Sequence, residues 1–257
     1  MQTLAATVHG PTDDFAATQW SVILAAGESQ EDPESSRAAL AALCQKYWPP
    51  LYSFVRGRGY SMHDAQDLTQ GFFAYLLEHK IYKRAEREKG KFRSFLLASF
   101  KNFLRDARDR REALKRGGGR EFLPLEEGQA SSAESLFQTH YSLGTDIASE
   151  DRVFERTWAE TLVTTALERL AASYNADGKE RLFAELRSFV TAGVAPLPSY
   201  TDLALRLRIA ESTLRSHVTR LRARYREILR AEVRRTVNSE AEVDDELREL
   251  LRVLSKT

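Results

Sequence analysis

Apolar residues recur at helical spacing along most of the chain. In the second half, Phe154, Trp158, Leu162, Ala166 and Leu170 follow one another every four residues. This spacing gathers side chains on one face of an α-helix, and the strict alternation of apolar and polar residues that favours a half-buried strand is absent. The chain is therefore predicted to be all-α, with helices over residues 35–56, 62–79, 92–115, 200–207, 211–235 and 240–255, and helical periodicity from 153 onward.

The helical pattern is interrupted once over a long stretch. Three glycines, Gly117 to Gly119, end the first half, and the segment from Glu126 to about Ser149 is acidic with few large apolar residues. Such a segment is expected to be a flexible tether with at most short helical turns. The predicted organisation is two small helical domains joined by an acidic linker: a disordered segment (1–17), a first domain (18–116), the linker (117–151), a second domain (152–236) and an acidic amphipathic C-terminal helix (237–257).

Charge is segregated along the chain, although the formal net charge is only +1. Residues 80–120 hold fifteen Lys and Arg against five acids, residues 121–151 hold seven acids and no Lys or Arg, and residues 199–235 hold ten Arg against four acids. Two basic blocks on a near-neutral chain are typical of a protein that contacts nucleic acid at two places. The alternative for either block alone is an ordinary solvated helical surface.

Several classes of protein are disfavoured. No window holds about 18 uninterrupted apolar residues and the N-terminus lacks the order of a secretory signal, so we expect a cytoplasmic protein without membrane insertion. The single cysteine, Cys44, excludes an intramolecular disulfide and lies in an apolar run, where a core role is expected. None of the five histidines lies four residues from another, and no phosphate-binding glycine loop is present. We therefore expect no catalytic residue, metal or cofactor, and no enzymatic activity.

A helix-turn-helix is indicated in the second half. Ser199 precedes Asp202 by three residues, a capping box that begins a helix near Tyr200. Its apolar residues are Leu203, Ala204 and Leu207; after a short break around residues 208–210 the pattern resumes with Leu214, Val218, Leu221, Tyr225 and Ile228. Two helices joined by about three residues form this motif. An ordinary helical hairpin is the alternative.

The opposite face of the second helix of this motif carries groups that read DNA. Arginine presents paired donors to guanine, and small hydroxyl side chains let a helix lie deep in the major groove. Arg226 and its neighbours would contact phosphates, which adds affinity without specificity. The candidate duplex-binding residues are Ser212, Thr213, Arg215, Ser216, Thr219, Arg220, Arg222 and Arg224.

The helix expected over 62–79 has two stripes. Ala65, Leu68, Phe72 and Leu76 form a buried stripe, whereas Gln66, Asp67, Gln70, Phe73, Ala74 and Leu77 form a mixed one on the other side. A mixed face favours a protein partner over water. The alternative is a core that surrounds this helix on both sides.

A basic loop from Ile81 leads into a helix that carries Phe92, Phe95, Phe100 and Phe103. Aromatic rings hold unstacked bases while Lys and Arg hold the backbone, so the pattern suits single-stranded nucleic acid. The alternative is that these phenylalanines, which have helical spacing, belong mostly to the core.

Three segments together resemble a known family. The run Asp64-Ala65-Gln66-Asp67-Leu68-Thr69-Gln70, the run Phe92-Arg93-Ser94-Phe95-Leu96-Leu97 and the segment from Tyr200 to Leu221 are similar, in order and spacing, to the sigma-70 family of RNA polymerase sigma factors, extracytoplasmic-function type. The run Lys115 to Gly119 and the acidic segment Glu242 to Leu247 resemble one group within it. The resemblance covers about residues 18–254.

This resemblance implies a transcription initiation factor that binds core RNA polymerase and promoter DNA. It assigns binding of the polymerase, at its clamp helices, to Asp64, Gln66, Asp67, Gln70, Phe73 and Leu77, and it names the polymerase flap as a further contact without residues. It assigns the minus-10 element to Lys83, Arg84, Arg87, Lys89, Lys91, Phe92, Arg93, Asn102 and Arg105, and the minus-35 element to the helix-turn-helix. The acidic linker would run toward the RNA exit path. An anti-sigma factor is a candidate regulatory partner, as is a kinase acting on Thr69.

Three positions depart from the family pattern. Arg208 stands where the turn usually has glycine, and a non-glycine residue at positive φ costs about 1 kcal/mol. Ala210 replaces the usual hydroxyl cap, which removes about 1 kcal/mol of capping. Gln66 replaces a carboxylate of the clamp-binding segment. The alternative function is a helix-turn-helix transcriptional regulator whose N-terminal domain senses a ligand or another protein.

Overall fold

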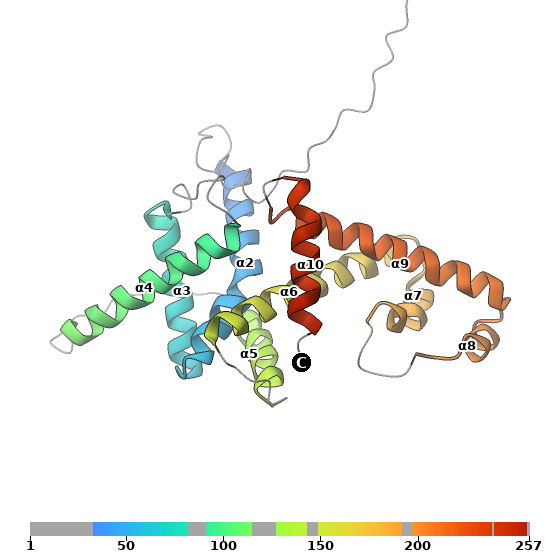
Figure 1. The fold of residues 1–257 in the computed structure, drawn as a ribbon, viewed down its shortest axis with the longest axis horizontal. Coiled ribbons are helices and arrows are strands. Elements are labelled where there is room, and N and C mark those ends of the chain that lie inside the picture. Colours follow the sequence, from blue (N-terminus) through green and yellow to red (C-terminus); the bar gives the residue numbers. More distant parts are fainter. Residues whose placement is uncertain are drawn as a thin grey trace, which may run out of the picture.

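The computed structural model describes residues 33–81, 91–114, 127–142, 149–191, 197–237 and 239–255, and all regular secondary structure within these ranges is helical (Figure 1). The predicted all-α class is confirmed. The helices are α2 (Pro33–Gly57), α3 (Met62–Glu78), α4 (Phe92–Leu114), α5 (Glu127–Ser142), α6 (Glu150–Ala176), α7 (Glu180–Leu186), the 3-10 turn η3 (Arg187–Phe189), α8 (Tyr200–Leu207), α9 (Glu211–Arg234) and α10 (Ala241–Ser255). None of the helices described is both long and apolar enough to cross a bilayer.

A first apolar core is built largely from aromatic side chains of α2, α3 and α4. The rings of Trp48 and Tyr52 stack with centroids 4.9 Å apart, and those of Phe72 and Phe100 are 4.8 Å apart. Each buried aromatic ring removes a large apolar area from water, so a few of them stabilise a small helical unit. The same core includes Val233 near the end of α9 and Leu250 of α10.

A second apolar core lies around the helix-turn-helix. Buried side chains of α8 and α9 meet those of α7, η3 and the end of α6; the members are Leu170, Tyr174, Leu186, Phe189, Leu203, Ala204, Leu214, Val218 and Leu221. A turn follows α6, with Gly178 at φ 67°. Glycine adopts this conformation without a steric penalty.

Helix α6 belongs to both cores. Phe154, Trp158 and Leu162 are buried in the first core, and Leu170 and Tyr174 in the second. Twenty-seven residues make a helix about 40 Å long, which is enough to pass through both. The first core therefore draws residues from both predicted domains, 18–116 and 152–236. The every-four spacing from Phe154 to Leu170 continues without a break, so one helix carries both sets.

The predicted linker contains a helix. Helix α5 lies within 117–151 and packs on α2, with Ala133 and Phe137 buried. The guanidinium of Arg56 in α2 donates to both carboxylate oxygens of Glu134, each at 2.9 Å, and stacks on the Phe137 ring at 4.9 Å. The prediction of at most short helical turns is thus wrong for residues 127–142, because a few apolar groups and one paired carboxylate suffice once α2 supplies a surface. The predicted disordered segment (1–17) lies outside the described residues.

Candidate nucleic-acid interface

The helix-turn-helix is formed by α8, three connecting residues and α9. The Ser199 hydroxyl accepts from the backbone N–H of Asp202 at 3.4 Å, which caps α8 as predicted. Helix α8 ends at Arg208, whose φ of 55° and ψ of 42° are left-handed, and Ala210 is extended at the start of α9 without a side-chain cap. Arg208 therefore adopts the left-handed conformation that favours glycine, and Ala210 begins α9 without a hydroxyl cap.

The motif is oriented by its buried stripe. Leu203 and Ala204 of α8 face Leu214, Val218 and Leu221 of α9 within the second core. This arrangement confirms the inward stripe that the sequence predicts. It leaves the other side of α9 exposed over its first three turns, namely Ser212, Thr213, Arg215, Ser216, Thr219 and Arg220.

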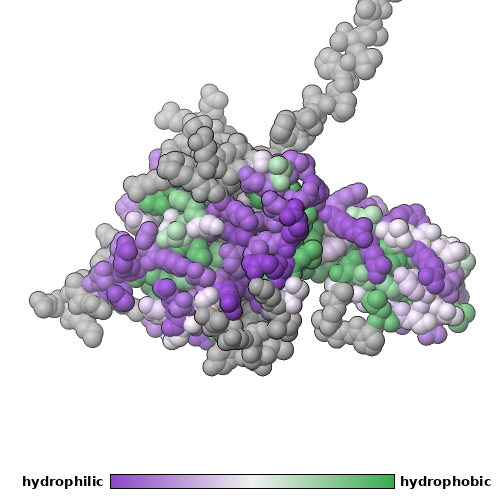
Figure 2. Space-filling view, viewed as in Figure 1, coloured by the Kyte–Doolittle hydropathy of each residue, from purple (hydrophilic) through white to green (hydrophobic). Residues whose placement is uncertain are grey.

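The exposed side chains of α9 make contacts with nearby residues of the motif. Arg215 donates to Glu211 at 2.6 Å and its guanidinium lies 4.5 Å from the centre of the Tyr200 ring. The hydroxyls of Ser216 and Thr219 donate to backbone carbonyls one turn earlier, at 3.0 and 2.9 Å. Hydrophilic side chains gather over α9 in Figure 2. The result is a continuous polar and cationic face whose donors have only exposed, easily exchanged partners.

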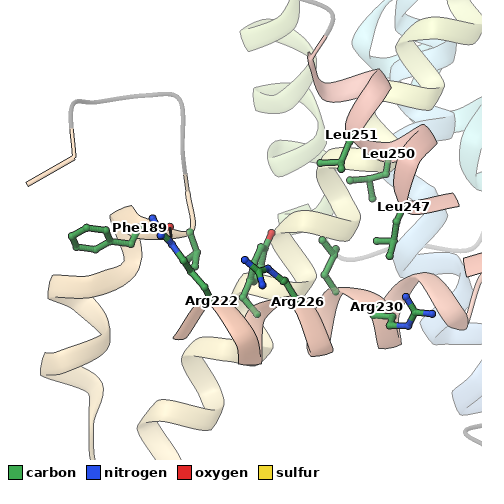
Figure 3. A pocket seen from close by; sticks show the side chains of 10 residues that line it. Phe189, Arg222, Arg226, Arg230, Leu247, Leu250 and Leu251 are labelled. Carbon is green, nitrogen blue, oxygen red and sulfur yellow. Dashed lines mark hydrogen bonds between the residues drawn. The ribbon is translucent and has the colours of Figure 1, made fainter. Parts of the chain in front are cut away.

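Two of the predicted arginines also contact neighbouring segments of the fold. Arg222 is half-buried, donates to the backbone carbonyl of Phe189 at 3.2 Å and lies over the Phe189 ring (Figure 3). Arg224 pairs with Asp177 at 3.7 Å. Arg222 therefore holds α9 on the second core, whereas Arg224 remains exposed and adds to the cationic surface that contains Arg215 and Arg220.

The predicted clamp-binding residues lie along α3. Asp64, Gln66, Asp67, Gln70 and Leu77 are half-buried. Asp64 belongs to the helix start, since its backbone N–H donates to the Ser61 hydroxyl at 3.1 Å, and Asp67 pairs with His63 at 3.4 Å.

Two further residues of α3 are not accessible. Phe73 is only 3% exposed and packs against Phe72 in the first core, so this conformation does not offer it to a partner. Thr69 is fully buried and donates to the carbonyl of Ala65 at 2.7 Å, which leaves a kinase no access to its hydroxyl. Because Phe73 and Thr69 are buried, the alternative in which a core surrounds α3 on both sides is correct for these two residues.

The predicted minus-10 residues fall into three groups: some are exposed or half-exposed, some are buried, and some lie outside the described residues. Asn102 and Arg105 are exposed on α4 and Lys91 is half-exposed, whereas Lys83, Arg84, Arg87 and Lys89 lie outside the described residues. Phe92 is fully buried, with its ring edge-on to Tyr47 at 5.5 Å. The assignment of Phe92 to DNA does not fit this conformation, because its helical spacing places it in the core.

Arg93 is also buried, and it is surrounded by acidic groups. It is 5% exposed, its Nε lies 2.9 Å from a carboxylate oxygen of Glu155, and its guanidinium lies 4.1 Å from the centre of the Trp158 ring. Glu246 of α10, 1% exposed, pairs with both Arg93 and Lys91. Burial and then the neighbouring Arg93 lower the pKa of Lys91, and burial raises the pKa of Glu155.

Glu246 and Glu155 are the residues that sequence reasoning missed. A signal was present for Glu246, which lies three residues after Val243 and four before Leu250, on the apolar stripe of α10. A carboxylate in such a stripe is buried and needs a cation. No comparable signal exists for Glu155, whose partner comes from a distant helix.

Other chemistry finds little support among the described residues. No group of three or more His, Cys, Asp and Glu side chains lies close enough there to hold a metal ion. Burial raises the pKa of the Cys44 thiol to about 12, so it is not a nucleophile near neutral pH.

Comparisons of the chain with protein-family models, with curated proteins and with solved structures found no match.

Proposed function

We propose that this chain is an RNA polymerase sigma factor of the extracytoplasmic-function type. It binds core polymerase in the cytoplasm, directs it to specific promoters and helps to melt the minus-10 region, without covalent chemistry of its own. The observation that carries the proposal is the helix-turn-helix of α8 and α9, with its exposed row of hydroxyl and arginine side chains. The order of the three sequence segments that resemble sigma factors gives the motif its context.

The first turns of α9 supply the chemistry for reading duplex DNA. Each arginine that binds a guanine edge with two donors contributes about 1–3 kcal/mol of discrimination against other bases. Arg215 and Arg220 are exposed on this face, and Ser212 and Ser216 are small enough to allow close approach. In the proposal these residues read the minus-35 element.

The front of the chain contacts the polymerase and the melted strand. Asp67 and Gln70 on α3 retain partial exposure, as do Lys91, Asn102 and Arg105 near or on α4. In the proposal, residues 18–116 and 152–236 contact two promoter elements, and α5 must leave α2 before the acidic segment between them can run through the polymerase.

A second candidate is a helix-turn-helix regulator with an N-terminal interaction domain. The helix-turn-helix alone fits it equally well, and the sharing of α6 between both cores favours a compact regulator of this kind. Binding to core polymerase separates the two candidates.

The decisive experiment is run-off transcription with purified core polymerase, the full chain and genomic fragments. Defined transcripts that depend on the added chain are expected, together with co-purification of chain and core polymerase. If the chain neither binds core polymerase nor starts transcripts, while still binding duplex DNA, the regulator is the better description.

A double substitution tests the polymerase contact. Asp67→Ala with Gln70→Ala is expected to weaken binding to core polymerase about tenfold, because lost hydrogen bonds to charged groups cost about 1.5 kcal/mol or more. Fluorescence anisotropy with labelled full chain measures this affinity. Duplex DNA binding by the same variant is the control and should be unchanged; an equal loss in both assays contradicts the assignment.

A further inference from the structure

The C-terminal helix α10 lies across α6 and beside α9 (Figure 1). Val243 and Leu250 anchor it in the first core. Between these two anchors lies the carboxylate of Glu246, which is almost fully buried. Helix α10 therefore brings a negative charge into the molecule and does not merely cover an apolar surface.

The partners of this charge are residues that the sequence assigns to DNA. Glu246 pairs with Lys91 just before α4 and with Arg93 in its first turn. Glu155 of α6 holds the other side of the Arg93 guanidinium. With only 5% of Arg93 exposed, a DNA phosphate cannot reach this guanidinium while α10 is in place.

The surface contacts between α10 and α9 are exposed ion pairs. Arg230 of α9 donates to Asp244 of α10 at 2.5 Å and to Glu240, just before α10, at 2.9 Å. Exposed pairs of this kind contribute little, and salt weakens them further. The pairs of Arg93 with Glu155 and Glu246 are buried, so Arg93 can leave Glu246 only if another anion, such as a phosphate, replaces its carboxylate.

The packing between α10 and α9 is also incomplete. A groove of about 530 Å³ separates them, with Leu247, Leu250 and Leu251 of α10 on one wall and arginines of α9 on the other (Figure 3). Leu251 is 63% exposed. A helix that fills its site incompletely loses less dispersion energy when it leaves.

We infer that α10 is a built-in acidic competitor of promoter DNA: in the closed conformation Glu246 holds Lys91 and Arg93, and α10 must move away before these cations contact the phosphates of the melted strand. The inference rests on the proposed function, which supplies the role of the two cations. Carboxylate and phosphate compete for the same donors, so DNA binding and closure by α10 oppose each other.

The test compares charge removal at two positions of α10. Glu246→Gln keeps the size of the side chain but weakens the contact with Lys91 and Arg93. Asp245→Asn removes the same charge from an exposed position whose partner is Arg248. The probe is a fluorescein-labelled single-stranded oligodeoxynucleotide of about 15 nucleotides, within the range that single-strand binders cover.

Glu246→Gln in the full chain is expected to bind this oligonucleotide about fivefold more tightly than the unaltered chain, and Asp245→Asn less than about twofold. Adding Lys91→Ala should remove the gain. Since loss of a buried charge can also disturb folding, a second variant weakens only the exposed anchors: Asp244→Asn with Glu240→Gln should give a gain in the same direction. Equal affinity of all folded variants overturns the inference.

Hydrogen–deuterium exchange follows the helix itself. Backbone amides of residues 241–255 are expected to exchange faster when the oligonucleotide is bound, whereas unchanged protection of α10 at saturation overturns the inference. Run-off transcription keeps the two proposals apart. If the unaltered chain starts transcripts but Glu246→Gln brings no gain, only the competitor role fails; if no variant binds core polymerase or starts transcripts, the sigma-factor proposal fails.

Discussion

At the scale of single residues, charged side chains hold this protein together where apolar contact is sparse. Glu134 is the clearest case among the described residues. Burial alone would raise its pKa, but hydrogen bonds from Arg56, Gln138 and Tyr52 outweigh burial and lower the pKa from 4.5 to about 2. One carboxylate thus fixes α5 on α2.

The pH dependence of stability follows from this pKa. Because the folded pKa lies below the unfolded one, Glu134 stabilises the fold above pH 4.5, and this contribution is lost as the pH falls toward 2. We expect Glu134→Gln to lower the free energy of unfolding by about 1–2 kcal/mol at pH 7 and by much less near pH 3. Urea unfolding at several pH values measures the difference, and a constant difference across this range contradicts the assignment.

Two arginines of α9, Arg215 and Arg226, are expected to contribute differently to DNA binding. Arg215→Ala is expected to reduce discrimination between duplexes of different minus-35 sequence about tenfold, since it lies on the exposed face of the first turns. Arg226→Ala, at the matched control position further along, should weaken all duplexes alike and reduce the salt slope by about 1. Binding isotherms at several salt concentrations distinguish them, and the reverse pattern means that another face of α9 meets the bases.

At the scale of elements, the turn between α8 and α9 stores a small strain. Arg208 has a φ of 55° and points its side chain into solvent, so its backbone conformation has no evident side-chain compensation. The turn keeps this geometry because Leu203 and Leu214 must meet in the second core. The packing of Leu203 and Leu214 therefore outweighs the backbone strain at Arg208.

Arg208→Gly should relieve this strain. Removal of the side chain gains about 1 kcal/mol, of which the greater freedom of glycine in the unfolded chain takes back about half, so the free energy of unfolding should rise by about 0.5 kcal/mol. Leu205→Gly, an exposed position inside α8, is the matched control and should lower it by about 1 kcal/mol. Chemical denaturation resolves the two signs; destabilisation by both would mean that Arg208 has a stabilising contact.

At the scale of the whole molecule, α6 connects both cores into one unit. Its N-terminal half is buried with α2 and its C-terminal half with the helix-turn-helix. Val233 near the end of α9 belongs to the first core, so α6 and α9 each contribute side chains to both cores. The two ends of the molecule are therefore expected to lose their structure together.

Unfolding should be a single cooperative transition. Tryptophan fluorescence follows the first core, where Trp48 and Trp158 are buried, while far-ultraviolet circular dichroism follows all helices. We expect coincident midpoints, and Leu170→Ala in the second core should lower both equally, with a cost of about 3 kcal/mol. Two separated transitions would show that the halves fold independently.

The sequence by itself determined most of the helices, the helix-turn-helix and its inward stripe, because periodicity and capping are local properties of neighbouring residues. The resemblance to the family indicated where the left-handed residue of the turn lies. Only the tertiary structure decided that Phe73, Phe92 and Arg93 are buried, that residues 127–142 form a helix and that α6 serves two cores. These outcomes depend on partners far away in the chain, such as Arg56 for Glu134 and Glu246 for Arg93, and no local pattern specifies which distant surface a side chain will meet.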